Sequence, residues 1–137
     1  MNLNIKLKQI TENDMLFLYE LLKNKDPNSN ISHKKMPTYA QHIKFIESRP
    51  YSKWYVIILN NQKIGSAYLS KQNEIGIFIT KNKQRKKLGT SVLDMIIKKN
   101  HRKRYLANVN PKNKKSISFF KKNGFELIQH TFELELS

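Results

Sequence analysis

The spacing of apolar residues in the first half of the chain predicts one strand followed by two helices. Ile5 and Leu7 lie on one face of a half-buried strand. Thr11 is typical of a helix N-cap, and Thr38 begins a second short helix that ends at Pro50. A polar loop, residues 25–37, separates the two helices. Their apolar positions recur at helical spacing: Met15, Leu18, Tyr19 and Leu22, then Tyr39, Ile43 and Ile46.

The second half predicts three consecutive strands and then an alternation of helices and strands. Residues 53–59 are nearly all apolar, as in a central strand, and residues 64–70 and 74–80 follow after polar turns. A helix begins within residues 82–96, with Leu88, Val92, Met95 and Ile96 on one face. Then come a strand over 104–110, a helix from Asn113 to a terminating Gly124, and strands over 125–130 and 131–137. This order predicts an α/β fold: a mixed, mostly antiparallel sheet of about six or seven strands with helices on both faces.

Length and composition add limits to this picture. A chain of 137 residues with 39% apolar residues fits a single domain over 1–137, whether free or part of a longer protein. No run of eighteen apolar residues and no signal peptide is visible, so we expect a cytoplasmic protein without a membrane span, in the host cytoplasm if it is viral. The absence of cysteine excludes disulfides, thiolate metal sites and a cysteine nucleophile.

Positive charge is concentrated in one part of the chain. The net charge is +16, and residues 81–122 hold fifteen Lys or Arg and a single acid, Asp94. Arg85, Lys86 and Lys87 stand at the start of a helix, where the dipole already repels cations. A bound phosphate would remove that repulsion, and Gly89 would let the backbone approach it. The spacing matches neither a Walker loop nor a dinucleotide fingerprint.

Two motifs resemble those of the GNAT N-acetyltransferase family. The segment "QRKKLG" is similar to the family's acetyl-CoA motif [Q/R]-x-x-G-x-[G/A] at Gln84 and Gly89, with Lys87 where the first glycine usually stands. The segment "NKKSISFFKKNGF", residues 113–125, resembles N-x-x-[SA]-x-x-x-Y-x-x-x-G-F, with Phe120 in place of tyrosine. The resemblance spans nearly the whole chain and implies acetyl transfer from acetyl-CoA to an amine by direct attack, with no metal.

The resemblance also implies which residues hold acetyl-CoA. The pantetheine would pair with the backbone of residues 77–79, where an N–H faces the thioester oxygen. The pyrophosphate would rest on the amides of residues 84–90, and α-helical residues after Asn113 would line the adenosine side. The expected cofactor-binding residues are Phe78, Ile79, Thr80, Gln84, Arg85, Lys86, Lys87, Leu88, Gly89, Thr90, Asn113, Phe119, Phe120 and Lys122.

The two departures from the family pattern have different consequences. Lys87 still offers a backbone amide, so we expect cofactor binding to survive. Phe120 lacks the hydroxyl that usually protonates the departing thiolate. Thiolate is a tolerable leaving group that water can protonate, so this departure leaves the reaction possible.

The general base is expected to be Glu74, at the start of a strand, with water or one of two histidines, His33 and His42, as alternatives. The histidines lie in the loop and helix that cover the acceptor site in this fold. The expected substrate-binding residues are His33, Met36, Tyr39, Trp54 and Tyr55. No His, Asp or Glu cluster has the spacing of metal ligands.

The acceptor is expected to be the amino group of a nucleotide-linked sugar. Residues 31–57 resemble, more loosely, the family members that acetylate such sugars, and the cationic field suits a diphosphate. Peptide, protein or polyamine acceptors are the alternative. A basic nucleic-acid-binding module is a different class, disfavoured because aromatic residues are not interleaved with the basic run. An oligomer is compatible with the sequence.

Overall fold

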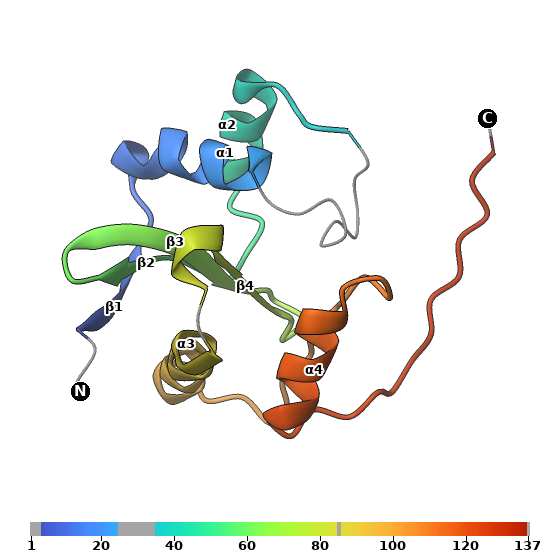
Figure 1. Ribbon diagram of the computed structural model, residues 1–137. Helices are drawn as coiled ribbons and strands as arrows, with labels where there is room; N and C mark the ends of the chain where they lie inside the picture. The colour runs from blue at the N-terminus through green and yellow to red at the C-terminus, as the bar shows by residue number, and fades with distance from the viewer. Residues whose placement is uncertain (1–3, 25–34, 85, 137) are drawn as a thin grey trace.

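The computed structural model describes residues 4–24, 35–84 and 86–136, and it places a sheet between two pairs of helices (Figure 1). Helices α1 and α2 cover one face, α3 covers the other, and α4 lies beside α3. Within these ranges no helix is long and apolar enough to cross a membrane. The elements are β1 (Ile5–Gln9), the 3₁₀ helix η1 (Glu12–Asp14), α1 (Met15–Lys23), α2 (Tyr39–Glu47), β2 (Lys53–Leu59), β3 (Gln62–Leu69), β4 (Ile75–Ile79), the 3₁₀ helix η3 (Lys81–Lys83), α3 (Lys86–Lys99) and α4 (Lys114–Lys122).

The four strands pair antiparallel in chain order, β1-β2-β3-β4. Trp54 stands opposite Tyr68, and Tyr55 stands opposite Ala67. Because side chains alternate across a strand, these two pairs face opposite sides of the sheet. Ring contact with Phe45 of α2 places Trp54 on the α1–α2 side. The sheet therefore presents one aromatic face, and its other face carries the core.

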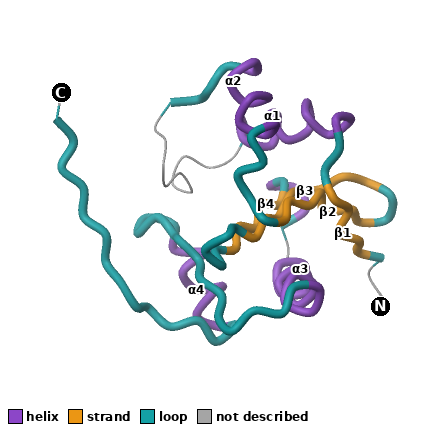
Figure 2. The backbone as a smooth tube through the Cα atoms, turned by 180° about the vertical axis from the view of Figure 1, so that it is seen from behind, coloured by secondary structure: helices purple, strands orange, loops and turns teal. Residues whose placement is uncertain are grey.

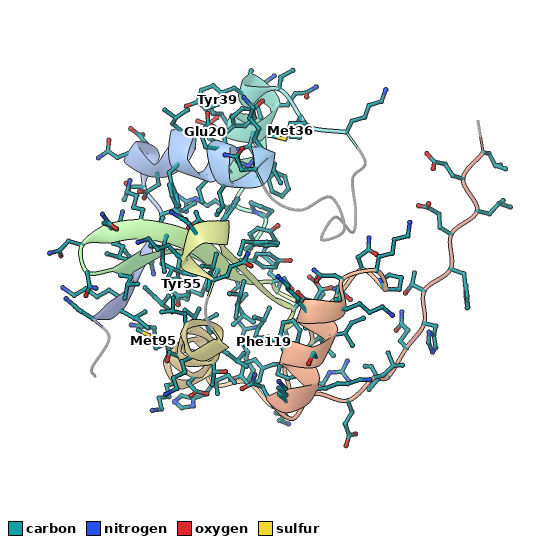
Figure 3. All side chains as sticks on the ribbon, in the orientation of Figure 1. Glu20, Met36, Tyr39, Tyr55, Met95 and Phe119 are labelled. Atoms are coloured by element: carbon teal, nitrogen blue, oxygen red, sulfur yellow. The ribbon has the colours of Figure 1, made fainter. Side chains whose placement is uncertain are left out.

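The core lies between the sheet and α3. Leu88, Val92 and Ile96 are fully buried and recur at helical spacing, as the sequence predicts. They pack against the face of the sheet that carries the odd-numbered residues of β2 and β4, and Figure 3 shows Tyr55 between the sheet and α3. The buried cluster consists of Ile57, Leu59, Ile64, Ala67, Leu69, Ile75, Leu88, Val92, Leu93 and Ile96.

The structure confirms the predicted helix caps, three at helix N-termini and one at a helix C-terminus. Thr11 and Thr38 each form a capping box, with Asp14 and Gln41 as the returning side chains. Asn113 caps α4 by accepting a hydrogen bond from the Ser116 amide. Gly124 has φ +90, and the amides of Gly124 and Phe125 bond back to Lys121 and Phe120, as in a Schellman motif.

The number of strands is smaller than predicted: the described residues form four rather than six or seven. Residues 104–110 contribute a single bridge, between Leu106 and Glu74. Residues 125–136 form no strand at all and run away from the body of the molecule (Figure 1). An alternating sequence forms a strand only when a neighbouring backbone satisfies its N–H and C=O groups, and residues 126–136 form no backbone hydrogen bond with another described residue.

A buried carboxylate joins the N-terminal segment to the sheet. Asp14 is fully buried and forms ion pairs with Lys8 of β1 (2.8 Å) and Lys63 of β3 (2.7 Å). Its Oδ2 also accepts a hydrogen bond from the Thr11 amide. Burial alone raises the pKa of Asp14, but the hydrogen bonds from Lys63, Lys8 and Thr11 outweigh it and lower the pKa to about 2.

We predict that Asp14→Asn lowers the free energy of unfolding at pH 7 by about 2 kcal/mol, because the folded state holds this carboxylate in its ionised form. The contribution is present above pH 4 and is lost as pH falls from the ordinary pKa of 3.8 through about 2. Urea unfolding at several pH values measures it, with exposed Asp94→Asn as the control. An unchanged difference between wild type and Asp14→Asn at pH 7 and pH 2.5 would contradict this assignment.

Candidate active site

A gap opens in the sheet where the chain beyond α3 leaves β4. The Ile75 amide donates to the Leu106 carbonyl (2.7 Å), and the Leu106 amide donates to the Asn73 carbonyl (2.8 Å). Beyond this bridge, no backbone hydrogen bond joins residues 107–110 to β4 in the part of the chain that the structure describes. The two segments therefore diverge toward the C-terminal end of β4.

The β4 backbone groups that face this gap follow from the pairing of β4 with β3. The Ser70 amide donates to Glu74 and the Thr80 amide donates to Ile64, so even-numbered residues of β4 bond to β3. Since such bonding alternates along an antiparallel strand, Ile77 and Ile79 direct their N–H groups into the gap. The Ile79 carbonyl accepts a hydrogen bond from the Gln84 side chain (2.9 Å).

Helix α3 begins just beyond the end of β4. Its first four amides, those of residues 86–89, have no acceptor within the helix, and the positive end of its dipole lies there. The side chain of Lys87 is exposed, while that of Leu88 is fully buried in the core, so Leu88 can offer a ligand only its backbone. The Thr80 amide is engaged with β3, and Arg85 lies outside the described residues.

Gly89 allows α3 and α4 to pack closely. A Cβ atom at this position would lie 2.8 Å from Cε1 of Phe119, so the ring occupies the space that a side chain would need. Figure 3 shows Phe119 on α4 at the side facing α3. Phe120 is half-buried, with its ring 5.1 Å from those of Phe119 and Phe125. From the sequence, we expect the glycine at position 89 to allow close approach of a bound phosphate. The structure gives a second reason for a glycine there, the close packing of α3 against α4.

Glu74 lies at the other end of β4, on its even-numbered face. Its Oε1 accepts a hydrogen bond from the Ser70 hydroxyl (2.9 Å), and its Oε2 accepts one from the Asn108 side chain across the gap. Each carboxylate oxygen keeps a second lone pair for another donor or proton. The carboxylate is thus oriented from both sides of the gap, yet it is half-exposed.

An aromatic cluster covers the same face of the sheet next to Glu74. Tyr51 and Tyr68 stack with ring centroids 3.9 Å apart and an interplanar angle of 8°. Burial, followed by the nearby Glu74 charge, raises the pKa of Tyr68. Burial, Tyr68 and Glu74 raise the pKa of Tyr51, so both hydroxyls stay protonated at neutral pH. The cluster comprises Phe45, Tyr51, Trp54, Tyr68 and Phe78.

The residues expected to bind the acceptor do not lie together. Trp54 belongs to the aromatic cluster, but Tyr55 faces the opposite side of the sheet, where it is buried and its hydroxyl accepts a hydrogen bond from Asn100. We therefore leave Tyr55 out of the acceptor site. Tyr39 packs on Tyr19 at the α1–α2 pair, near Met36 (Figure 3).

Of the two histidines expected as alternative bases, the structure describes only His42. His42 is buried between α1 and α2, with its ring 5.6 Å from that of Tyr19. His33 lies outside the described residues. Among the described side chains, no group of three or more His, Asp or Glu could hold a metal ion.

A family model described as the acetyltransferase (GNAT) family matches residues 15–125. The chain belongs to this family. GNAT enzymes are acetyl-CoA-dependent N-acetyltransferases, and the match includes β4, the start of α3 and all of α4.

Solved structures share this GNAT fold. A domain from Methanocaldococcus jannaschii is 26% identical with a TM-score of 0.77, over 96% of this chain and 94% of that one. Spermidine/spermine N-acetyltransferase SpeG from Vibrio cholerae is 19% identical (TM-score 0.69; 92% and 81% covered). The ribosomal L7/L12 alpha-N-protein acetyltransferase RimL, solved with coenzyme A, is also 19% identical (TM-score 0.71; 91% and 81% covered). A comparison with curated proteins found no match.

The sequence analysis does not predict several residues of this candidate site, namely Phe45, Tyr51, Tyr68, Ser70 and Asn108. Strand register is the signal that could have found Tyr68, because alternation places it on the same side as Glu74 and Phe78 once β3 and β4 are paired. The contact between Asn108 and Glu74 joins residues 34 positions apart. No local pattern predicts such a contact.

Proposed function

We propose that this chain transfers the acetyl group of acetyl-CoA to a primary amine in the gap between β4 and residues 106–110, by direct attack in a ternary complex. The observation that carries the proposal is the pair of odd-numbered β4 amides, those of Ile77 and Ile79, aimed into the gap. Backbone amides need acceptors, and an extended amide-bearing ligand such as pantetheine supplies them as an added strand.

The proposed cofactor site continues from β4 to α3 and α4. The pyrophosphate rests on the first-turn amides of α3, with Arg85, Lys86 and Lys87 supplying positive charge. Gln84 is already bonded to Ile79, so its role is to hold the loop beneath the phosphates. On α4, Asn113 uses its Oδ1 as a helix cap and has its amide nitrogen to offer the pantetheine. Phe119, Phe120 and Lys122 flank the adenosine.

The proposed chemistry uses one amide and one carboxylate. The amine nitrogen attacks the thioester carbonyl carbon, and the Ile77 amide donates to the oxygen as negative charge develops there. The C–S bond breaks as the amide bond forms. Glu74 takes the proton released by the amine, directly or through a water. The thiolate leaves and takes a proton from water, because Phe120 has no hydroxyl to give.

Three observations support Glu74 rather than His42 as the proposed base. Glu74 lies beside the gap, is oriented by Ser70 and Asn108, and borders the aromatic cluster. The ring of His42 contacts that of Tyr19, and its side chain is buried between α1 and α2, the helices that cover the aromatic face. We therefore retain Glu74 and a water relay as the proposed route for the proton.

For the acceptor we propose the amino group of a nucleotide-linked sugar. The aromatic cluster offers ring faces on which a sugar or a base can stack, and a protein of net charge +16 attracts a diphosphate. A sugar amine also loses its proton more readily than a lysine amine, so it needs only a weak base.

A polyamine or peptide amine is the second candidate. It is favoured by one observation, the Glu74 carboxylate next to the stacked Tyr51–Tyr68 pair, since carboxylates and aromatic faces attract ammonium groups. SpeG and RimL share the fold of this chain and are named for such acceptors.

We predict that Glu74→Gln lowers kcat about 10²-fold while the Kd of acetyl-CoA stays within about twofold, because glutamine keeps the hydrogen bond from Ser70 but accepts no proton. Steady-state thiol release and a thermal shift with acetyl-CoA measure the two quantities. Exposed Glu12→Gln removes the same charge elsewhere and should behave as wild type. Wild-type turnover by Glu74→Gln would transfer the role of base to water or to one of the histidines, His33 or His42.

The acceptor proposal is tested by kcat/KM for an amino-sugar nucleotide, the same free amino sugar, spermidine and a lysine peptide. We expect the nucleotide-linked sugar to be at least tenfold better than the free sugar, with the advantage shrinking as salt screens the diphosphate. Equal values for the two sugars would show that the nucleotide is not recognised. A higher value for spermidine or the peptide would establish the second candidate.

A further inference from the structure

Arg102 joins three segments that are far apart in the sequence. It lies in the segment that follows α3 and is half-buried. Its Nη1 donates to Asn73 Oδ1 (2.8 Å) and to the Ser70 carbonyl (3.4 Å), and its Nη2 donates to Ser52 Oγ (3.0 Å). All three acceptors are uncharged oxygens. The planar guanidinium group therefore links the turn between β3 and β4 to the connection between α2 and β2.

On one side, this guanidinium group holds the α2–β2 connection, residues 50–52, which carries Tyr51. The connection crosses from the helices to the sheet in both views (Figures 1 and 2). Its backbone forms no hydrogen bond with the rest of the described chain. The ring of Tyr51 stacks on Tyr68, and the next residue, Ser52, accepts the bond from Arg102. Side-chain contacts therefore fix the position of this connection.

On the other side, the guanidinium group holds the β3–β4 turn, residues 70–74, which places Glu74. The amide of Asn73, a residue with φ +69, donates to the Ser70 carbonyl (3.2 Å). The Ser70 hydroxyl donates to Glu74 Oε1 (2.9 Å) and accepts a hydrogen bond from the Glu74 amide (3.0 Å). Arg102 contacts the Ser70 carbonyl and the Asn73 side chain, so it fixes the turn that orients the carboxylate.

The backbone of Arg102 is anchored to the core side of the molecule. Its amide donates to the Tyr105 hydroxyl (3.0 Å), and that hydroxyl donates to the Asn100 carbonyl. Asn100 is buried at the end of α3, where its amide donates to the Ile96 carbonyl. The base of the arginine side chain is therefore fixed, and its rigid fork sets the separation of the two segments that it contacts.

We propose that Arg102 is a positioning residue for the acceptor site. It holds the α2–β2 connection and the β3–β4 turn at a fixed separation, so that the Tyr51 ring and the Glu74 carboxylate border one site. Arg102 acts through the groups that it bonds and not on the acceptor itself. The inference rests on the proposed function, because it takes the aromatic cluster as the acceptor site and Glu74 as the base.

The first test is steady-state kinetics of Arg102→Gln with acetyl-CoA and, in turn, an amino-sugar nucleotide and spermidine. We expect kcat/KM for the acceptor to fall at least about fivefold, while the Kd of acetyl-CoA stays within about twofold. Arg102→Lys keeps the charge but places all its donors on one nitrogen, so it should lose as much. Lys103→Gln removes a charge at the neighbouring exposed residue and should behave as wild type. A smaller loss in Arg102→Gln, or recovery by Arg102→Lys, would overturn the proposal.

Single substitutions separate the two sides of the fork. Ser52→Ala removes the bond to the α2–β2 connection at an exposed residue, so it should raise the acceptor KM more than it lowers kcat. Asn73→Gly suits φ +69 and removes the side-chain bond to the β3–β4 turn, so it should mainly lower kcat. Each change should have a smaller effect in Arg102→Gln, where its bond is already lost. Full additivity in both double-mutant cycles would contradict a shared role.

Fluorescence of Trp54, the only tryptophan, distinguishes failure of this inference from failure of the proposed function. Its ring centroid lies 4.8 Å from that of Tyr51, so a shift of the α2–β2 connection changes its surroundings. We expect a shifted emission maximum and stronger acrylamide quenching in Arg102→Gln, with unchanged circular dichroism, and wild-type emission in Lys103→Gln. Unchanged emission in Arg102→Gln would overturn the positioning role and leave the proposed function standing. Changed emission with wild-type turnover would instead overturn the proposed acceptor site on which the inference rests.

Discussion

The divergence of residues 107–110 from β4, after a single bridge at Glu74 and Leu106, is the constraint on which the site depends. If the two segments stayed paired, the amides of Ile77 and Ile79 would be satisfied within the sheet. Because they separate, the middle of the protein contains strand backbone with hydrogen-bonding capacity for a ligand. The side chain of Asn108 still crosses the gap to Glu74, which keeps the two sides in register.

Side chains alternate between the two faces of the sheet, so most of the core and the proposed acceptor site lie on opposite faces. Odd-numbered residues of β2, of β4 and of β3 from Gly65 onward face α3, and Ile64 joins them because the register shifts there. The even-numbered residues Trp54, Tyr68 and Phe78 lie on the opposite face. Substitutions on the aromatic face therefore change the proposed acceptor site without opening a cavity in the core. Tyr55 illustrates the rule, since a one-residue step from Trp54 moves it from the aromatic face to the core.

Local patterns in the sequence were sufficient to predict most helices and strands and where the helices begin or end. Thr11, Thr38, Asn113 and Gly124 define helix ends through contacts within a few residues, and Leu88, Val92 and Ile96 define the buried face of α3 by spacing alone. The motif around Gly89 indicated the family, which the family model confirms. The cofactor and acceptor residues stay predictions.

The features that the sequence could not predict are contacts between residues far apart in the chain. The packing of Gly89 against Phe119, the stacking of Tyr51 on Tyr68 and the Asn108–Glu74 bond each join separate elements. Residues 126–136 have the alternation of a strand, but alternation does not tell whether a backbone is available to pair with them.

Hydrogen exchange of the β4 amides, resolved by NMR, tests the central claim most directly. In the free protein, the amides of Gly76 and Phe78 should exchange slowly because they bond to β3, while those of Ile77 and Ile79 exchange faster. Saturating acetyl-CoA should slow Ile77 and Ile79 at least tenfold and leave the even-numbered amides nearly unchanged. If acetyl-CoA binds and the exchange of Ile77 and Ile79 does not change, the cofactor does not pair with β4 and the account is wrong.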